Sequence, residues 1–433
     1  MAASKSKAAA LSAELLLKFR TNFAADPKNL LAQNACSKFD PNEICLSRNK
    51  LQTTHHVFTH KIEAEGKPIT NQKNSGRCWI FAALNVMRIP FIKHFNLEDF
   101  EFSQGYLFFY DKVERANFFL HNVVETARRG EAVDGRLVSF LLHDPTCDGG
   151  QWDMLVSLVN KYGLMPKKSF PESFSCESSV RMNAIIKSKL REYAKVLRTM
   201  VDDGKEETQI EAEIERQMES VFRIVGICLG VPASTFTWEY YDKSKAYNAV
   251  GPLTPQEFYQ KHVCLVTDPR PSNPYGRAYT VDCLGNVVGG RPIVYNNQPV
   301  ELLARLAADS IRANEAVCHD YELVFGVEVN QGLSKADRLL YGESMMTHAM
   351  VFTAVSLEGA QAEGKPQKWR VENSWGDDRG EKGYIVMSQD WFAEYVFEVV
   401  VDKKFVPSEV LEVFSETPHV LPAWDPMGTL AKC

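Results

Sequence analysis

The chain has 433 residues, 45% hydrophobic and 24% charged, which is typical of a folded protein with a sizeable core and not of a disordered one. The formal net charge of −6 gives no basic excess, which argues against a nucleic-acid or anionic-membrane partner. The sequence shows neither a run of about twenty apolar residues nor a secretory signal, so no membrane segment is predicted. The ten cysteines form no CxxC pair, so we expect free thiols in a reducing compartment and a cytoplasmic protein.

Three helical regions are predicted in the first half of the chain. Residues 10–24 place leucine and phenylalanine at helical spacing, which predicts a surface helix. A polar loop at 71–76 leads into residues 79–86, which are apolar on nearly all faces and predict a buried helix ending within a turn of Pro90. Residues 177–227 contain two helical patterns separated by a polar turn, which predicts a helical hairpin.

The second half is predicted to be rich in β-structure. From about residue 265, proline, glycine and β-branched residues become frequent, and short strands are predicted at 323–329, 348–355, 369–371 and 384–387. Helices early and strands late predict an α+β protein. The tail 418–433 contains three prolines and is expected to be extended.

Cys78 is a candidate nucleophile because it stands where the polar loop enters the apolar helix. A thiol attacks only as the thiolate, and the N–H groups and dipole of a helix start stabilise that anion. Gln72, six residues upstream, carries an amide that with the Cys78 N–H could stabilise an oxyanion, by about 3–4 kcal/mol per donor. Taken alone, a cysteine such as Cys78 is far more often an ordinary buried thiol.

His348 and Asn373 are candidates for the base and the group that holds it. His348 begins an apolar strand, and Asn373 follows the next predicted strand. The base of a cysteine peptidase needs its second ring nitrogen held by an acceptor, which an asparagine oxygen can supply. Trp375 could cover that hydrogen bond. Taken alone, His348 could be a core histidine and Asn373 a turn residue.

Together these residues resemble the papain family of cysteine peptidases, in which Gln72, Cys78-Trp79, His348 and Asn373-Ser374-Trp375-Gly376 have counterparts in the same order. Ser75 stands where secreted and lysosomal members carry a disulfide-forming cysteine, which agrees with a reducing compartment. His348 lies 270 residues after Cys78, against roughly 130–150 in the simple enzymes. The difference predicts insertions, and the helical hairpin is the obvious candidate.

Longer strings are similar to the bleomycin hydrolase branch of that family, which is cytosolic: residues 66–72, 149–154, 237–240 and 421–428. This resemblance implies a papain-like fold with a helical half, a β-rich half, a helical insertion and a C-terminal tail in the active-site cleft. The implied segments are an N-terminal helical segment (1–65), the catalytic helical half (66–175), the helical insertion (176–262), the β-rich catalytic half (263–402) and the tail (403–433).

The resemblance also implies an activity, a cysteine aminopeptidase that removes N-terminal residues from peptides with a free N-terminus and hydrolyses the amide of bleomycin. The Cys78 thiolate and the His348 imidazolium would form an ion pair oriented by Asn373, and catalysis would pass through a thioester. The resemblance implies a homohexamer without metal or organic cofactor. The C-terminal carboxylate, on Cys433 or on Lys432 after removal of Cys433, would anchor the substrate amine.

Two departures from relatives qualify this prediction. Relatives carry more residues after His262, and they carry a core strand and loop where only Cys318, His319 and Asp320 stand here. The sequence therefore predicts a missing strand near His348, with reduced stability or activity. The alternative function is a catalytically impaired, shortened isoform that acts as a papain-fold scaffold or binding assembly. An endopeptidase or transglutaminase-like acyltransferase would share the chemistry but require an open cleft.

Overall fold

The computed structural model of the protein describes residues 10–40, 44, 48–63, 65–254, 263–313, 317–321, 332–360 and 364–431. The chain divides into two compact units. The first comprises residues 1–55 and 324–332, and the second comprises residues 56–323 and 333–433. Among the described residues, no helix has the length and apolar character needed to cross a bilayer.

The described part of the first unit is helical, with α1 (Ala13–Ala25), α2 (Pro27–Cys36) and α4 (Arg48–Thr53). The Ser12 hydroxyl accepts the Leu15 N–H at 3.1 Å and caps α1. Asp26 caps α2, and Pro27 occupies its first position, where no N–H is needed. No residue of α1 or α2 is buried, so the predicted surface helix at 10–24 is confirmed.

The helices of the second unit form a helical half around α5, whose side chains are mostly buried. As predicted, α5 is a buried helix, and it ends about one turn beyond Pro90. The predicted hairpin is also confirmed, since α10 and α11 pack against each other and against α6. The bounds are α5 (Cys78–His94), α6 (Gln104–Arg128), α7 (Arg136–His143), α8 (Trp152–Tyr162), α9 (Phe174–Glu177), α10 (Val180–Asp202) and α11 (Glu207–Leu229).

A ten-stranded sheet forms the β-rich half, in the order β10-β9-β8-β7-β11-β4-β6-β5-β12 with β1 beside β8. The predicted strands at 348–355, 369–371 and 384–387 are confirmed as β8, β9 and β10, whereas 323–329 lies outside the described residues. The bounds are β1 (His60–Lys61), β4 (Val263–Val266), β5 (Arg277–Val281), β6 (Tyr295–Asn297), β7 (Val317–Tyr321), β8 (His348–Leu357), β9 (Pro366–Glu372), β10 (Tyr384–Ser388), β11 (Val396–Val401) and β12 (His419–Leu421).

The prediction of a missing strand near His348 is wrong. The remaining residues form β7, which lies between β8 and β11 and pairs antiparallel with both. Tyr321 at the end of β7 is opposite His348 at the start of β8. Five residues are enough to continue the ladder between these two strands, so the shortened segment still fills that position in the sheet.

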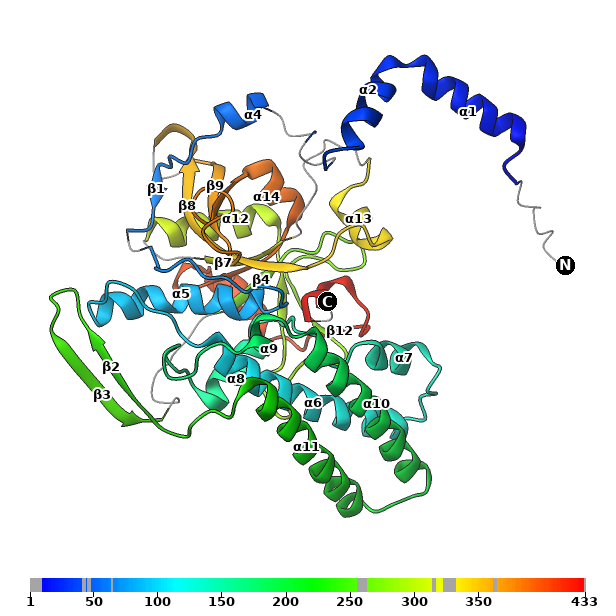
Figure 1. Cartoon of the computed structure of the whole chain (residues 1–433), viewed down its shortest axis with the longest axis vertical. Coiled ribbons are helices and arrows are strands. Elements are labelled where there is room, and N and C mark those ends of the chain that lie inside the picture. Colours follow the sequence, from blue (N-terminus) through cyan, green and yellow to red (C-terminus); the bar gives the residue numbers. More distant parts are fainter. Residues whose placement is uncertain are drawn as a thin grey trace. The chain divides into compact units, whose positions relative to one another are not determined.

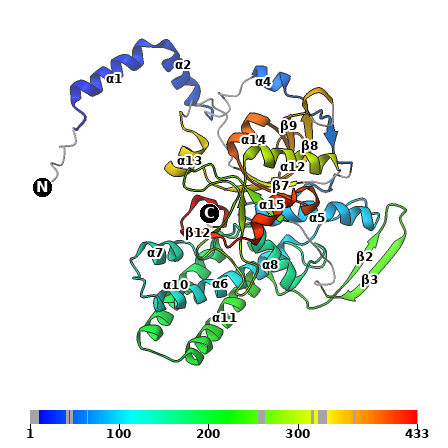
Figure 2. The same cartoon turned by 180° about the vertical axis from the view of Figure 1, so that it is seen from behind.

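The two halves of the second unit meet at α5, and the α+β fold is confirmed. Figures 1 and 2 show α6, α8, α10 and α11 on one side of α5, and β7, β8 and β9 with α12 (Val300–Arg312) and α14 (Gln389–Tyr395) on the other. One cluster of buried apolar side chains fills the helical half and extends onto strands of the sheet, and a second lies between the sheet and α12 and α14. The remaining elements are the hairpin β2 (Phe236–Tyr241) and β3 (Tyr247–Leu253), α13 (Lys335–Tyr341) and α15 (Ser408–Glu412).

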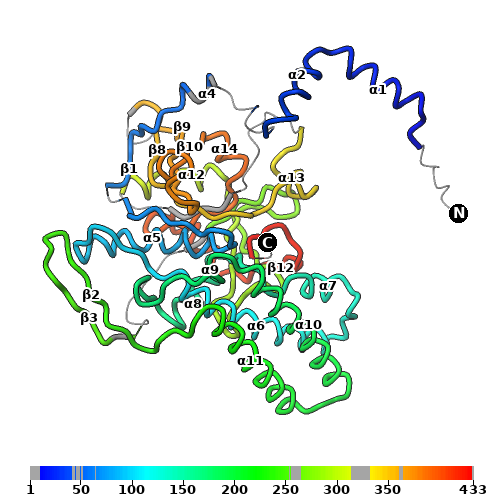
Figure 3. Tube along the Cα trace, in the orientation of Figure 1, coloured from blue at the N-terminus to red at the C-terminus, as the bar shows by residue number. Residues whose placement is uncertain are grey.

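The tail is extended only in part. Its strand β12 pairs parallel with β5, but the following residues Pro426–Ala431 form a buried 3-10 helix, so the expectation of an extended tail is wrong there. Asp425 starts this helix, because its carboxylate accepts the Met427 N–H at 2.9 Å. Figure 3 traces the segment, in red, between the helical half and the β-rich half.

Candidate active site

Cys78 is the first residue of α5, and its side chain is buried, with 3% of the residue exposed. The preceding Arg77 makes no side-chain capping bond to the helix. The positive end of the helix dipole therefore lies at the thiol, as the sequence predicts for a residue that must become an anion.

The loop that carries Cys78, residues 72–78, is held by its own side chains and is called the nucleophile loop below. Gln72 Nε2 donates to the Ser75 carbonyl at 2.6 Å, and Ser75 Oγ donates to the Gln72 carbonyl at 2.6 Å. Arg77 is fully buried, its Nε donates to Ser75 Oγ at 2.9 Å, and its Nη1 lies 2.7 Å from Glu172 Oε2. These contacts fix the backbone immediately before Cys78.

His348 is the first residue of β8, and its ring is held on two sides. Its Nε2 lies 2.9 Å from Asn373 Oδ1, and Trp375 stacks on the ring with centroids 5.0 Å apart. Asn373 Oδ1 also accepts the Ser374 N–H at 2.8 Å, which identifies this atom as the oxygen. An oxygen only accepts, so the His348 proton lies on Nε2 and the neutral ring keeps Nδ1 as its basic atom.

Burial lowers the pKa of His348 to about 4, and the hydrogen bond that the ring donates to Asn373 opposes that lowering. As long as Cys78 is a neutral thiol, the neutral imidazole is therefore the favoured form of His348 at neutral pH. A neutral imidazole can accept a proton from a thiol. The predicted imidazolium would need the thiolate charge beside it to offset its burial.

The nucleophile loop is paired with the asparagine loop, residues 373–376. The Gln72 N–H donates to the Ser374 carbonyl at 2.8 Å, and Ser374 Oγ donates to Gln72 Oε1 at 2.6 Å. Next to them, the Gly376 N–H donates to the Thr70 carbonyl at 3.0 Å. A Cβ on Gly376 would lie 2.7 Å from the Asn71 amide, and its φ of 86° also requires glycine.

The predicted residues therefore come together in one region of the second unit. Hydrogen bonds and stacking join Gln72, His348, Asn373 and Trp375 through Ser374. Cys78 belongs to the same buried cluster as the residue after His348, and α5 packs along β8.

The proposed anchor for the substrate amine, on Lys432 or Cys433, lies outside the described residues. The preceding residues are fixed beside the helical half, where Arg115 Nη1 donates to the Ala431 carbonyl at 3.4 Å and Gln151 Nε2 to the Met427 carbonyl at 3.4 Å. A Cβ on Gly149 would lie 1.8 Å from the Leu430 carbonyl oxygen, so the tail approaches this glycine as closely as backbone allows.

Three polar residues around the site escaped the sequence analysis: Arg77, Glu172 and Asp148. No local pattern links Glu172 or Asp148 to the nucleophile loop, because the Gly76–Asp148 contact joins residues 72 positions apart. The arginine directly before the candidate cysteine is visible in the sequence, but its burial is not. Within the described residues, no group of three or more histidine, cysteine or carboxylate side chains is arranged to hold a metal ion.

Comparison with known proteins identifies close relatives. A sequence model of the Peptidase C1-like family matches residues 10–319 and 318–428. The chain is 54% identical to bleomycin hydrolase of Gallus gallus over 452 positions, covering 98% of this chain and 99% of that protein. It is 38% identical to aminopeptidase C of Streptococcus thermophilus, covering 97% of this chain and 99% of that protein. The first alignment is longer than this chain, so the Gallus gallus protein carries residues that this one lacks.

A solved structure supports the fold directly. The crystal structure of pepW from Lactobacillus rhamnosis HN001 superposes with a TM-score of 0.91 at 38% identity, covering 97% of this chain and 99% of that one. The agreement extends over both the helical half and the β-rich half.

Proposed function

Because the chain belongs to the Peptidase C1-like family and is a cysteine aminopeptidase, we propose that Cys78 is its nucleophile, His348 its base and Asn373 the residue that orients the base. The observation that carries this assignment is the 2.9 Å hydrogen bond between His348 Nε2 and Asn373 Oδ1, buried under Trp375. It holds Nδ1 as the proton acceptor, while α5 presents Cys78 at its positive end.

The proposed reaction follows from these positions. His348 Nδ1 takes the thiol proton, and the Cys78 sulfur forms a bond to the carbonyl carbon of the first peptide bond. The tetrahedral intermediate collapses, the C–N bond breaks, and His348 returns the proton to the leaving amine. His348 then removes a proton from a water molecule as the water oxygen attacks the thioester carbon. The C–S bond breaks, the amino acid is released, and the proton on His348 passes to the sulfur to restore the thiol.

Gln72 is the proposed oxyanion donor together with the Cys78 N–H. Its Oε1 accepts from Ser374 and one N–H of its amide donates to Ser75, so both ends of the amide are fixed. An amide nitrogen carries two N–H groups, and the second is the one proposed to bind the oxyanion. A donor held in place before the reaction stabilises the developing charge without reorganisation.

Selectivity for a free N-terminus requires an acceptor for the substrate ammonium group. We propose that the carboxylate of the last residue, Lys432 or Cys433, is that acceptor. Support comes from the buried path of residues 426–431, which pass beside Gly149 and are held by Arg115.

The bleomycin hydrolases among the relatives suggest the amide of bleomycin as a second substrate.

We further propose a homohexamer in a reducing compartment, the cytoplasm. The exposed apolar side chains of α1 and α2 support assembly through the first unit, and second copies of the chain are the proposed partners. Six cysteines among the described residues are free thiols, which agrees with a reducing environment.

The test is hydrolysis of a free-amine aminoacyl-coumarin amide and of its N-acetylated form. The wild type is expected to cleave only the free-amine substrate, and Cys78→Ala to lose activity by at least about 1,000-fold. Cys228→Ala, at another cysteine with a free thiol, is the matched control and should retain activity. Activity that survives Cys78→Ala would overturn the assignment, and no activity from folded wild type would favour the impaired-isoform alternative.

A further inference from the structure

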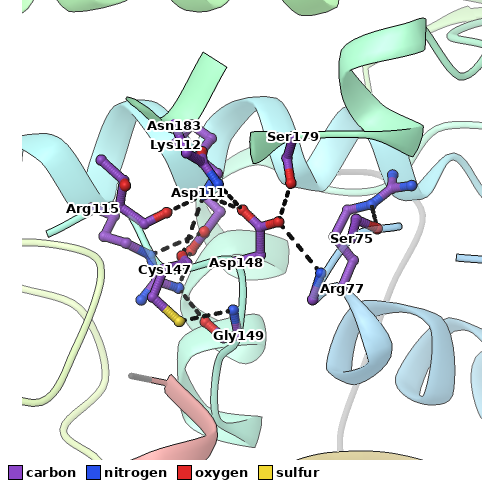
Figure 4. A network of polar contacts seen from close by, with 12 residues as sticks. Ser75, Arg77, Asp111, Lys112, Arg115, Cys147, Asp148, Gly149, Ser179 and Asn183 are labelled. Carbon is purple, nitrogen blue, oxygen red and sulfur yellow. Dashed lines mark hydrogen bonds and ion pairs between the residues drawn. The ribbon is translucent and has the colours of Figure 1, made fainter. Parts of the chain in front are cut away.

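A buried carboxylate outside the catalytic set holds the nucleophile loop. Asp148 Oδ1 accepts from Lys112 Nζ at 2.6 Å and from Asn183 Nδ2 at 2.7 Å, and Oδ2 accepts from Ser179 Oγ and from the Gly76 N–H at 3.3 Å. Figure 4 shows these contacts converging on one side chain. Asp148 is 7% exposed, so all four donors act on it in a largely buried site.

The same residue contacts the chain on both sides of Cys78. Gly76 lies two residues before the cysteine, and Trp79, directly after it, donates its Nε1–H to the Asp148 carbonyl at 2.8 Å. The approach at Gly76 is close, because a Cβ there would lie 3.0 Å from the Asp148 Cβ. On the other side, a Cβ on Gly150 would lie 2.6 Å from the Trp79 ring. The segment 148–150 therefore fixes the start of α5 by hydrogen bonds and by contact.

Two of the three side-chain donors connect Asp148 to the helical insertion. Ser179 precedes α10 and Asn183 lies in its first turn. Nearby, the Asn74 N–H of the nucleophile loop donates to the Glu177 carbonyl at 2.9 Å. The insertion thus packs directly against the nucleophile loop, and Asp148 is the residue through which α10 reaches Gly76.

The charge of Asp148 is maintained despite its burial. Burial by itself would raise the pKa of Asp148, but the Lys112 ammonium and the hydrogen bonds from Lys112, Ser179 and Asn183 hold it well below its ordinary value. Lys112 also donates to the Thr146 carbonyl. A buried ion pair is a weak source of net stability compared with apolar packing, whereas its directional bonds fix geometry.

We propose that Asp148 is a positioning residue of the peptidase, which holds Gly76 and the first turn of α5 so that the Cys78 sulfur and N–H meet the substrate carbonyl. The proposal rests on Cys78 as the nucleophile. It assigns a role to the helical insertion as well, because α10 supplies two of the donors that orient the carboxylate.

The test compares Asp148→Asn with Glu114→Gln. Both change one buried carboxylate that pairs with a lysine, and Glu114 lies on α6 beside the network, where its Oε1 accepts from Lys161 at 2.6 Å without contacting the nucleophile loop. The measurements are kcat and KM per active site on the free-amine substrate, and the rate of Cys78 alkylation by iodoacetamide at pH 7, located by peptide mass. Ser179→Ala, which removes a single donor, is the milder variant and decides the matter if Asp148→Asn does not fold.

For Asp148→Asn we expect kcat to fall roughly 30- to 100-fold with KM changed less than about 3-fold, and Cys78 alkylation to slow, since displacing reacting atoms by about 1 Å has an effect of this order. Ser179→Ala should lower kcat about 3- to 10-fold, and Glu114→Gln should leave both rates near wild type. A folded Asp148→Asn with wild-type kcat, or a Ser179→Ala indistinguishable from wild type, would overturn the proposal. Faster alkylation in Asp148→Asn would also overturn it, because that result assigns Asp148 an electrostatic effect on the thiolate.

The alkylation measurement distinguishes a failure of this inference from a failure of the proposed function. If Cys78→Ala retained peptidase activity, the nucleophile assignment would fail, while the alkylation rates of Cys78 would still report whether Asp148 positions that residue. If Cys78→Ala abolished activity and Asp148→Asn changed nothing, only the positioning role would fail.

Discussion

His348, the proposed base, is as buried as a residue of the hydrophobic core. The residue is 6% exposed, and its ring bonds to Asn373 and stacks against Trp375. Burial favours the neutral ring, which is the form that can remove a proton from Cys78. The same burial should make the stability of the folded protein depend on pH.

We expect His348 to destabilise the folded protein at acidic pH. Its pKa falls from 6.5 to about 4 on folding, so between these values the unfolded chain binds a proton that the folded chain does not. Its contribution to stability is therefore fully present above about pH 6.5 and is lost as pH falls toward 4, by up to about 3 kcal/mol. The measurement is urea unfolding of Cys78→Ala and of Cys78→Ala with His348→Gln, at pH 7 and pH 4.5. The difference between the two proteins gives the contribution of His348 to the free energy of unfolding, and both lack the thiolate of Cys78. Equal pH dependence in the two proteins would contradict it.

The residues proposed for catalysis could be picked out from the sequence because the chemistry restricts their residue types, whereas the residues that hold them in place could not. A thiol at a helix start, a histidine and an asparagine after a strand are recognisable from local sequence. Asp148 and Glu172 act through contacts with Gly76 and Arg77 that fold topology alone creates. No spacing rule relates such residues before the fold is known.

Between elements, one buried ion pair links α5 to the strand that leads into the asparagine loop. Arg88 Nη2 lies 2.9 Å from Glu372 Oε1, and both side chains are 1% exposed. Arg88 Nη1 also donates to the Pro68 carbonyl at 2.7 Å, just before the nucleophile loop. Burial raises the pKa of Glu372, and the Arg88 charge opposes that rise. The pair therefore joins the segments that carry Cys78, Gln72 and Asn373.

Removing one member of this pair should destabilise the protein strongly. Glu372→Met leaves Arg88 buried without its counter-charge, which we expect to lower the free energy of unfolding by about 3–5 kcal/mol. The double variant Arg88→Met with Glu372→Met should lose less than the sum of the two single losses, because neither charge is then left alone. Chemical denaturation of the wild type, the two single variants and the double variant gives the coupling free energy between Arg88 and Glu372. Glu219→Met, at an exposed pair with Arg223, is the control and should change stability by less than about 0.5 kcal/mol. Additive losses at Arg88 and Glu372 would argue against coupling.

For helices and strands, the sequence predicted the elements that have a local hydrophobic pattern. It did not predict the elements whose position depends on pairing with distant segments. α5 follows from a stretch that is apolar on nearly all faces, and the hairpin of α10 and α11 follows from apolar residues at helical spacing. β7 was not predicted, because its place depends on backbone bonds to β8 and β11 and not on its own pattern. The 3-10 helix at Pro426–Ala431 depends likewise on burial against distant segments.

For the whole molecule, the first unit presents apolar surface that its own fold does not cover. Leu17 is 65% exposed, Phe19 50% and Leu31 73%, and α1 and α2 contain no buried residue. Exposed apolar surface on this scale marks an interaction site. The residues proposed for catalysis all lie in the second unit, so assembly and the chemical step can be separated by substitution.

We therefore expect Leu17→Ser, Phe19→Ser and Leu31→Ser together to break the assembly without removing the catalytic site. Size-exclusion chromatography with light scattering should give six times the chain mass of 48.9 kDa for the wild type and a smaller species for the variant. Leu340→Ser, a substitution of a leucine exposed to 60% on α13, is the matched control and should keep the larger mass. The kcat per active site on the small aminoacyl-coumarin substrate should stay within about 3-fold, since Cys78, His348 and Asn373 come from one chain. An unchanged mass in the triple variant would show that another surface holds the copies together.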